Sequence, residues 1–528
     1  MSTDIALADN DCYLALKARD ARFDGSFFTG VTSTGIYCRP VCSVKTPKRE
    51  NCRFFHHAAQ AESAGFRPCL RCRPELAPHS VVWSIQDASY VLAHQAARLL
   101  DEPEAWADAA PSVEKLAATL GVSDRHVRRI FEAQFGVSPM QYLQTRRLHT
   151  AKQLLADTAL PITQIALMSG YASVRRFNAA FLEHYKLNPT QLRRKGTMAN
   201  SGNIDPTQAN GCTTVRLGYR PPYDVQAMLA FFGKRLITAI ELMGDSAQGP
   251  WLARTLRVES GKKICSGWLQ VRFDESRSQV VLTVSDSLRD LLPLVIRRVR
   301  STFDLDANPN AINSVLHGSF PSGDGLRVPG AFDGYELAVR AVLGQQITVA
   351  AARTLAQRMV DQFGEPITSP WPELTRLFPS PSVLAAASGD ALGQLGIVRQ
   401  RQAAIIGIAR AVAEKRLHLH SGADVNATVA TLKELPGVGE WTAQYIAMRA
   451  LRWPDAFPSG DVALHKALGV QGLKNPVRLA EDASAAWKPW RSYAVIRVWS
   501  GTWDGTTKTT SAPEKDVPGQ SPRSKEAS

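Results

Sequence analysis

Four cysteines near the N-terminus have the spacing of a metal site. Cys38 and Cys42 form one close pair, and Cys69 and Cys72 form a second pair after a loop-sized insert. Four thiolates in paired spacing are typical ligands of tetrahedral Zn²⁺. Around a divalent ion they leave a net charge of about −2, which makes each sulfur electron-rich and nucleophilic. The spacing therefore predicts one zinc site, either purely structural or carrying a reactive sulfur.

A glycine turn followed by a lone acid is the second candidate for chemistry. The turn is Leu435-Pro436-Gly437-Val438-Gly439, and the acid is Asp461. Because Gly437 and Gly439 lack side chains, the backbone amides of the turn could approach a phosphate of DNA at the start of the following helix. Asp461 could then act on the bound DNA. The alternative is an ordinary turn and an ordinary surface aspartate.

Helices are expected to position both this turn and a repeated basic motif. Residues 441–451 have apolar side chains at helical spacing, and residues 427–432 give a weaker helical pattern. Within residues 80–195, a segment of two helices joined by a turn occurs twice, and each second helix is basic. This repetition predicts a double helix-turn-helix that binds DNA. The arginines expected to contact DNA are Arg125, Arg128 and Arg129 in the first copy and Arg175 and Arg176 in the second.

Length, charge and hydropathy restrict the class of protein. A chain of 528 residues is too long for one core, so three or four domains are expected. Its formal charge of +14 favours a polyanionic partner, most commonly nucleic acid. With neither a membrane-spanning apolar run nor an apolar signal core, the sequence indicates a soluble cytosolic protein without a membrane partner. Eight cysteines in such a protein argue against disulfides.

Between the basic helices and the glycine turn the pattern changes from mixed to helical. Residues 213–217 and 279–284 indicate strands, whereas residues 225–236 and 288–299 indicate helices. From about residue 310 the pattern is almost wholly helical, including residues 334–343 and 350–360. Residues 198–210 are rich in Asn, Ser and Gly and indicate a linker. The last residues, 505–528, have the composition of a disordered tail.

The cysteine module resembles the N-terminal domain of Ada DNA-repair regulators. The resemblance lies in Thr34-Gly35-Ile36-Tyr37-Cys38-Arg39-Pro40-Val41-Cys42 and Gly65-Phe66-Arg67-Pro68-Cys69-Leu70-Arg71-Cys72-Arg73-Pro74. It implies that Cys38 accepts a methyl group from a methylphosphotriester in DNA, and that all four cysteines bind zinc. Spacing alone does not choose Cys38 among the four. Cations that could hold the phosphate backbone are Arg39, Lys45, Lys48, Arg49, Arg53, Arg67, Arg71 and Arg73.

The second helix-turn-helix is similar to AraC-type regulators. Its matching residues are Ile165-Ala166, Gly170-Tyr171, Phe177, Phe181 and Pro189. The resemblance implies binding to promoter sites in double-stranded DNA, with RNA polymerase as a further partner. Lys186 stands where that family usually has glycine, so a different turn is an alternative at this position.

The C-terminal half resembles AlkA-type 3-methyladenine DNA glycosylases of the helix-hairpin-helix superfamily. This resemblance implies that Asp461 is the catalytic acid, and that Leu435, Gly437 and Gly439 of the hairpin contact DNA, with a monovalent cation as an optional ligand there. Trp441 stands where relatives that also cut the backbone have a lysine, so a monofunctional enzyme is implied. No cysteine follows Cys265, so no iron–sulfur cluster is expected. The residues that carry the resemblance are Tyr219-Arg220-Pro221-Pro222-Tyr223-Asp224, Leu343-Gly344-Gln345-Gln346, Leu435–Gly439 with Trp441-Thr442-Ala443, and Trp487-Lys488-Pro489-Trp490-Arg491-Ser492-Tyr493.

Aromatic residues of this half match the base pocket of that family. Alkylated purines are cationic, and stacking on aromatic faces favours them by roughly 1–2 kcal/mol. The residues implied are Trp441, Tyr445, Trp499 and Phe231, with ordinary core packing as the alternative for each. Gln346 occupies the position of an apolar wedge that fills the gap left by a flipped base, and a glutamine could also hydrogen-bond there.

Together these features predict a fusion of a methylation-sensing regulator with a base-excising enzyme that serves defence against DNA alkylation. The alternative is a regulator whose C-terminal half binds damaged DNA without excision. A bacterial, cytoplasmic protein associated with the nucleoid is expected. The expected fold class is multidomain α+β, with a zinc domain (1–78), an all-α double helix-turn-helix (80–195), a linker (196–211), a small α+β domain (212–309), an all-α helix-hairpin-helix domain (310–504) and a tail (505–528).

Overall fold

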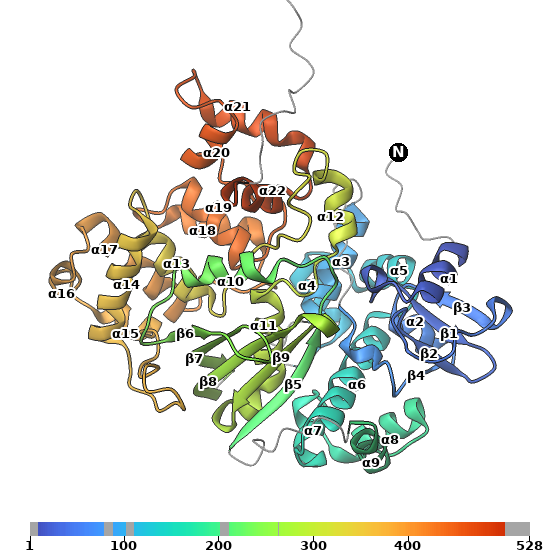
Figure 1. Ribbon diagram of the computed structural model, residues 1–528. Coiled ribbons are helices and arrows are strands. Elements are labelled where there is room, and N and C mark those ends of the chain that lie inside the picture. Colours follow the sequence, from blue (N-terminus) through green and yellow to red (C-terminus); the bar gives the residue numbers. More distant parts are fainter. Residues whose placement is uncertain (1–8, 79–87, 102–109, 201–210, 262, 502–528) are drawn as a thin grey trace, which may run out of the picture.

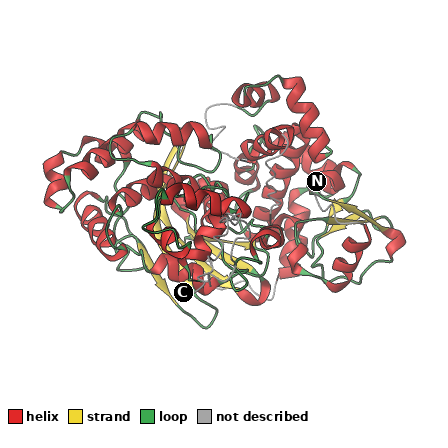
Figure 2. Ribbon diagram, turned by 90° about the horizontal axis from the view of Figure 1, so that it is seen from above, coloured by secondary structure: helices red, strands yellow, loops and turns green. Residues whose placement is uncertain are grey.

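The computed structural model describes residues 9–78, 88–101, 110–200, 211–261 and 263–501 (Figure 1). Most of the expected linker, the whole expected tail and the first eight residues lie outside these ranges. Figure 1 shows the small N-terminal sheet on the right, the larger sheet near the centre and the C-terminal helices at the left and top. Seen from above in Figure 2, the two sheets are separate and helices surround both. No helix among the described residues is long and apolar enough to cross a membrane.

The N-terminal module is a four-stranded sheet with two helices. Strand order is β3-β1-β2-β4, with β2 antiparallel to β1 and parallel to β4. Phe28, Tyr37 and Phe66 form its small apolar core. Because Tyr37 pairs with Pro68, the end of β2 and the end of β4 lie side by side, which brings the two cysteine pairs together. The elements are α1 (Asp9–Ala18), β1 (Phe28–Val31), β2 (Ile36–Cys38), β3 (Cys52–Phe55), α2 (Ala58–Ser63) and β4 (Arg67–Pro68).

The described residues between 88 and 200 form seven helices, in which a long helix, α6, connects two similar units. Ser123 and Ser173 cap the second helix of each unit by accepting hydrogen bonds from the backbone amides of His126 and Arg176. This geometry confirms the expected double helix-turn-helix. The helices are α3 (Ala88–Asp101), α4 (Val113–Leu120), α5 (Asp124–Phe135), α6 (Pro139–Asp157), α7 (Ile162–Met168), α8 (Val174–Tyr185) and α9 (Pro189–Asn200).

The central module is an antiparallel five-stranded sheet of order β5-β9-β8-β7-β6. Strands β5 and β9, which are neighbours at one side of the sheet, agree with the sequence prediction, whereas β6, β7 and β8 were not predicted. The helix predicted over residues 288–299 begins only at Leu292, because Pro293 suits a first helical turn and a 3-10 segment, η7 (Asp286–Leu291), precedes it. The elements are β5 (Cys212–Gly218), α10 (Val225–Gly233), β6 (Glu241–Gly244), β7 (Trp251–Ser260), β8 (Lys263–Asp274), β9 (Gln279–Ser285) and α11 (Leu292–Thr302).

The C-terminal module is helical, as expected, around a large apolar core that includes Ile408, Leu432 and Ile446. Both helices predicted beside the glycine turn are present, as α18 and α19. The helices are α12 (Pro309–Leu316), α13 (Gly334–Leu343), α14 (Val349–Phe363), α15 (Pro381–Ala386), α16 (Gly389–Gln394), α17 (Arg399–Ala413), α18 (Val425–Glu434), α19 (Glu440–Arg449), α20 (Val462–Ala467), α21 (Pro476–Ala483) and α22 (Arg491–Trp499).

The modules pack against one another rather than hanging from linkers. One apolar core runs from Leu148 of α6 to Val215 of β5 and Phe303. Asp157, at the end of α6, accepts hydrogen bonds from Arg73 of the N-terminal module at 2.5 Å and from the Arg216 amide of β5 at 3.3 Å. Three modules therefore meet at one buried carboxylate.

Arg220 makes a second junction between the N-terminal module and the C-terminal half. Its guanidinium is fully buried and donates to the Asp24 carbonyl at 2.5 Å, the Pro78 carbonyl at 2.9 Å and the Asp306 carbonyl at 2.8 Å. Burial lowers the pKa of Arg220 to about 10, so it stays charged near neutral pH. One cation thus bridges segments far apart in the chain.

Candidate functional sites

The four predicted zinc ligands come together in space. The sulfur atoms of Cys38, Cys42, Cys69 and Cys72 all lie within 4.8 Å of one another. A tetrahedral zinc site with Zn–S bonds of about 2.3 Å places its sulfurs about 3.8 Å apart. The cluster therefore fits one Zn²⁺ ion.

The four thiols behave as one electrostatic unit. Hydrogen bonds from Cys38 lower the pKa of Cys42 and Cys69, whereas hydrogen bonding to Cys42 raises the pKa of Cys38 and burial raises that of Cys72. The Arg39 amide also donates to the Cys72 sulfur at 3.3 Å. Four close thiolates repel one another unless protons lie between them. A divalent cation can replace these protons, because it binds the deprotonated form of each ligand.

Not all of the cations near the cysteines can hold DNA. Arg39 and Arg73 are buried, where Arg39 pairs with Asp24 and Arg73 pairs with Glu75 and Asp157. The expectation that these two grip a phosphate backbone is therefore wrong, because burial and paired carboxylates already occupy them. Exposed side chains remain at Lys45, Lys48, Arg53 and Arg71.

The arginines of the two basic helices are exposed. Arg125, Arg128 and Arg129 lie on α5, and Arg175 and Arg176 lie on α8. Lys186 ends α8 in the left-handed conformation with φ of 54°, as Gly136 ends α5 with φ of 67°. The lysine thus keeps the turn that glycine makes in the first unit.

A cavity of about 450 Å³ lies between the central sheet and the C-terminal helices. Residues of α13, α14, α19, α20 and α22 line it, together with strands β6 and β7. The aromatic residues among its lining are Phe232, Phe332, Trp441, Tyr445 and Trp499, and Asp461 lies in the same wall.

Asp461 is held by two indoles and a helix end. Trp441 Nε1 donates to its Oδ2 atom at 3.0 Å, and Trp499 Nε1 donates to its Oδ1 atom at 3.2 Å. The Leu464 amide donates to Oδ1 at 3.0 Å, since Asp461 is the N-cap of α20. Three donors therefore fix the orientation of the carboxylate at the cavity wall. Spacing in the sequence did not reveal these hydrogen bonds.

The predicted pocket aromatics divide into two groups. Trp441 stacks on Tyr445 with a centroid distance of 5.2 Å and an interplanar angle of 12°, and Trp499 lies 6.1 Å from Tyr445. Phe231, by contrast, is not among the residues that line the cavity; its neighbour Phe232 is. The ring of Phe231 contacts the guanidinium of Arg235 at 3.7 Å and that of Arg449 at 4.8 Å.

Charged residues that sequence reasoning missed also line the cavity. Arg254 pairs with Glu241 at 3.1 Å and Glu336 at 2.6 Å, and Arg340 pairs with the same two carboxylates at 3.2 Å and 2.8 Å. Only the spacing of Glu336 and Arg340, one helical turn apart, was a signal in the sequence.

Arg449 adds a cation beside the aromatic wall. It donates to the Tyr445 hydroxyl at 2.5 Å. Although burial by itself raises the pKa of Tyr445, the cations of Arg449 and Arg235 lower it overall.

The glycine hairpin has the predicted form. Gly437 adopts φ of +80°, and a Cβ atom there would lie 3.0 Å from the Gln400 carbonyl. Gly439 is the N-cap of α19 and has open space where a side chain would stand. The start of α19 is therefore accessible to a phosphate. Gln346 is exposed in the turn between α13 and α14, with φ of 53°.

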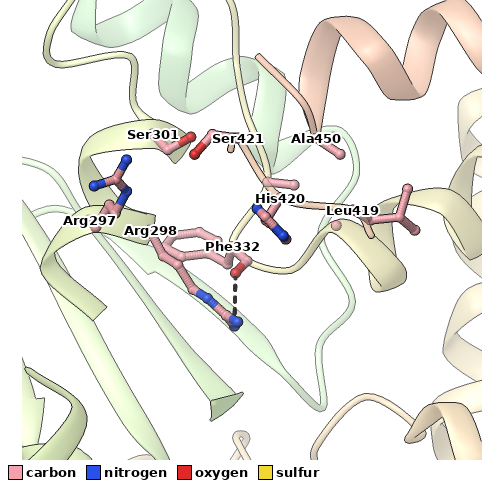
Figure 3. Close-up of a pocket in the computed structure, with 10 residues that line it drawn as sticks. Arg297, Arg298, Ser301, Phe332, Leu419, His420, Ser421 and Ala450 are labelled. Atoms are coloured by element: carbon pink, nitrogen blue, oxygen red, sulfur yellow. Dashed lines mark hydrogen bonds between the residues drawn. The ribbon is translucent and has the colours of Figure 1, made fainter. Parts of the chain in front are cut away.

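A second, much smaller cavity lies beside α11 (Figure 3). Its volume is about 40 Å³, and it lies among Arg298, Phe332, His420 and Ser421. In Figure 3 the Arg298 guanidinium bonds to the Phe332 carbonyl, at 3.5 Å. A liquid water occupies about 30 Å³, so this cavity has room for water rather than for a nucleobase.

Comparisons with known proteins match the modules in the same order. The chain matches the metal binding domain of Ada over residues 11–75 and a helix-turn-helix domain over residues 116–195. It matches the AlkA N-terminal domain over residues 214–333 and the HhH-GPD superfamily of base excision DNA repair proteins over residues 339–491.

Among curated proteins, a probable bifunctional transcriptional activator/DNA repair enzyme AlkA of Mycobacterium tuberculosis is 37% identical over 93% of this chain and 95% of its own length. The chain belongs to this family of Ada–AlkA fusion proteins. Its C-terminal half is 34% identical to DNA-3-methyladenine glycosylase 2 of Escherichia coli, over 54% of this chain and 95% of that protein. The other half of the fusion is 31% identical to the bifunctional transcriptional activator/DNA repair enzyme AdaA of Bacillus subtilis, over 38% of this chain and 91% of that protein.

Proposed function

We propose that this fusion protein repairs and reports DNA alkylation through two chemical centres. The C-terminal centre excises 3-methyladenine and other alkylated bases as a monofunctional DNA glycosylase. The N-terminal centre accepts a methyl group from DNA methylphosphotriesters, once per molecule, and converts this event into sequence-specific transcriptional activation. We assign its four modules to residues 1–78, 80–195, 212–309 and 310–504.

The observation that carries the excision half is a carboxylate fixed in an aromatic cavity. The cavity of about 450 Å³ has room for a purine, and Trp441, Tyr445 and Trp499 offer ring faces to a cationic base. As the bond between base and sugar breaks, positive charge develops on the deoxyribose, and the Asp461 carboxylate stabilises that charge. Water completes the reaction by adding to the cationic sugar carbon and losing a proton to solvent, which leaves the free base and an abasic site. Trp441 stands at the position where a lysine would form a Schiff base, so no strand cleavage is expected.

The acceptor half uses the sulfur of Cys38. The Cys38 sulfur attacks the methyl carbon, a C–S bond forms, and the C–O bond to phosphorus breaks, so the phosphate leaves as an ordinary diester. Zinc bound by the four cysteines would keep the thiols deprotonated. The thiolate becomes a neutral thioether, which removes one negative charge from a surface that faces phosphates. Stronger DNA binding follows, because fewer like charges oppose contact.

Two further groups of residues are proposed to contact DNA. The exposed arginines Arg125, Arg128, Arg129, Arg175 and Arg176 would read promoter sites, with RNA polymerase as the partner of activation. Leu435, Gly437 and Gly439 would hold a phosphate near the lesion, with or without a monovalent cation. Such a protein would act in the bacterial cytoplasm, on the nucleoid.

One experiment tests both centres. Purified protein is incubated with DNA methylated by a radioactive methylating agent, and both free-base release and protein-bound label are measured. We expect Asp461→Asn to lose base release and keep protein labelling, and Cys38→Ala to do the reverse. Wild-type protein that releases no 3-methyladenine would favour the alternative, a regulator whose C-terminal half only binds damaged DNA. Undiminished labelling of Cys38→Ala would reject the acceptor assignment.

A further inference from the structure

Gln345 connects the turn after α13 to the glycine hairpin. It lies in the turn that joins α13 to α14, where Gly344 and Ile347 line the cavity. Its side-chain amide nitrogen donates to the Gly437 carbonyl at 2.9 Å and to the Thr442 hydroxyl at 2.9 Å. Gly437 belongs to the glycine hairpin, and Thr442 lies in the first turn of α19. One side chain therefore joins the turn at the cavity to the hairpin.

Helix α17 contacts both the turn after α13 and the glycine hairpin. Arg401 donates to the Gln345 backbone carbonyl. On the same helix, the Gln400 carbonyl and the Ala404 methyl close the space beside Gly437, since they would lie 3.0 Å and 3.2 Å from a Cβ atom at that position. The turn and the hairpin therefore both pack against α17, and the Gln345 side chain joins them to each other.

The contacts of Gln345 also fix the backbone of the next residue, Gln346. Gln346 is exposed and has φ of 53°, a conformation that a residue with a side chain avoids unless its neighbours hold it. The donors and acceptors around Gln345 are the contacts that hold it on the hairpin side. Gln346 is thereby held exposed next to Ile347 of the cavity lining, at a set position relative to the start of α19.

We propose that Gln345 is a positioning residue that couples phosphate binding at the hairpin to insertion of Gln346 into the DNA helix. When the hairpin grips the backbone, Gln346 is already placed to fill the space of the base that enters the cavity. Gln345 itself touches neither the base nor the sugar. The inference rests on the proposed excision function, because it assigns a role in presenting the base to Asp461.

The test uses the full-length protein and a DNA duplex that carries a tetrahydrofuran abasic analogue opposite 2-aminopurine, whose fluorescence rises when it is unstacked. Gln345→Met keeps the size of the side chain and removes both donors. Gln357→Met is the matched control, because the Gln357 amide hydrogen-bonds, within the part of the chain that the structure describes, to Thr238 and Asp361, neither of which lines the cavity. We expect wild type and control to give equal fluorescence rises, and Gln345→Met to lose at least half of the rise while Kd increases about tenfold, as for loss of one to two hydrogen bonds.

Kinetics distinguish positioning from simple weakening. In single-turnover excision of 3-methyladenine, we expect Gln345→Met to lower the rate at saturating protein about tenfold or more, because insertion and not only binding is impaired. Equal fluorescence, Kd and rate for Gln345→Met and Gln357→Met would overturn the proposal. If Gln345→Met is less stable than the control, Thr442→Val and Thr442→Ser replace it: only the valine variant, which lacks the hydroxyl, should show the defect.

The outcomes also separate this inference from the proposed function. A wild-type protein that gives the fluorescence rise, and loses it on Gln345→Met, but excises no base would retain the positioning role and reject the glycosylase. A wild-type protein that excises bases with a rise indifferent to Gln345 would reject the positioning role alone. Failure of the wild type to bind the duplex would reject both.

Discussion

The zinc cluster and the aromatic cavity around Asp461 place their polar groups in different ways. The cluster takes its four ligands from within residues 38–72: Cys38 ends β2, Cys42 follows it, and Cys69 and Cys72 follow the adjacent end of β4. The cavity holds Asp461 through Trp441, 20 residues before it, and Trp499, 38 residues after it, each on a different helix. The first centre is therefore assembled by a local sheet and a metal, and the second by packing of a large helical core. Loss of zinc should therefore abolish the activity of the cluster alone. Single substitutions in the cavity should instead lower its activity in part.

The largest expected effect is removal of zinc, because a structural zinc site contributes about 10 kcal/mol or more to folding. A strong chelator should make the segment around β2 and β4 sensitive to protease and abolish methyl acceptance. Excision should survive, since none of the residues lining the cavity is a cysteine. Cys212→Ser, on β5 and outside the cluster, serves as the control for thiol loss. Simultaneous loss of excision on chelation would show that the two centres are not separable.

Loss of one indole donor should be the next largest effect. Trp441→Phe and Trp499→Phe keep a ring in the cavity wall and each remove one N–H bond to the Asp461 carboxylate. A hydrogen bond to a charged group contributes about 1.5–3 kcal/mol, which corresponds to roughly 10-fold to 150-fold in rate. We expect losses of this size in single-turnover excision and no change in methyl acceptance. Trp371→Phe, outside the cavity, should be neutral; equal rates for all three variants would contradict this role of the indoles.

Arg220 tests whether the two regions are mechanically joined. Arg220→Met leaves the carbonyls of Asp24, Pro78 and Asp306 without this donor, and we expect a cost of about 2–4 kcal/mol. Urea unfolding should then separate into two transitions, with the N-terminal module released first. Arg272→Met is the control, because its guanidinium bonds to the Gln248 carbonyl at the surface. A single unchanged transition would mean that Arg220 does not hold the modules together.

The smallest effect concerns the two helix-turn-helix units. Lys186 adopts a left-handed conformation that costs about 1–2 kcal/mol for a residue with a Cβ, whereas Gly136 adopts it freely. We expect Lys186→Gly to stabilise the protein by about 1 kcal/mol in urea unfolding, and Lys115→Gly, inside α4, to destabilise it by a similar amount. A destabilising Lys186→Gly would indicate a contact of the lysine side chain that outweighs backbone strain.

The sequence by itself determined which kinds of functional site the chain contains and their order along it. Two cysteine pairs predict zinc because metal ligation depends on short spacings, and the two basic units of residues 80–195 predict a double helix-turn-helix because each unit is a local motif. The glycines of Leu435–Gly439 and the tryptophan at position 441 were equally readable, since a turn and a single substitution are local features.

Only the tertiary structure decided which side chains meet. It brought the indoles of Trp441 and Trp499 to Asp461, packed the Phe231 ring against Arg235 and Arg449 of the cavity lining, and buried Arg39 and Arg73 in ion pairs. It also brought Arg220 against the N-terminal module and joined Gln345 to the hairpin. Such contacts form between residues far apart in the chain, so they depend on how whole elements pack, and no local pattern of residue types encodes them.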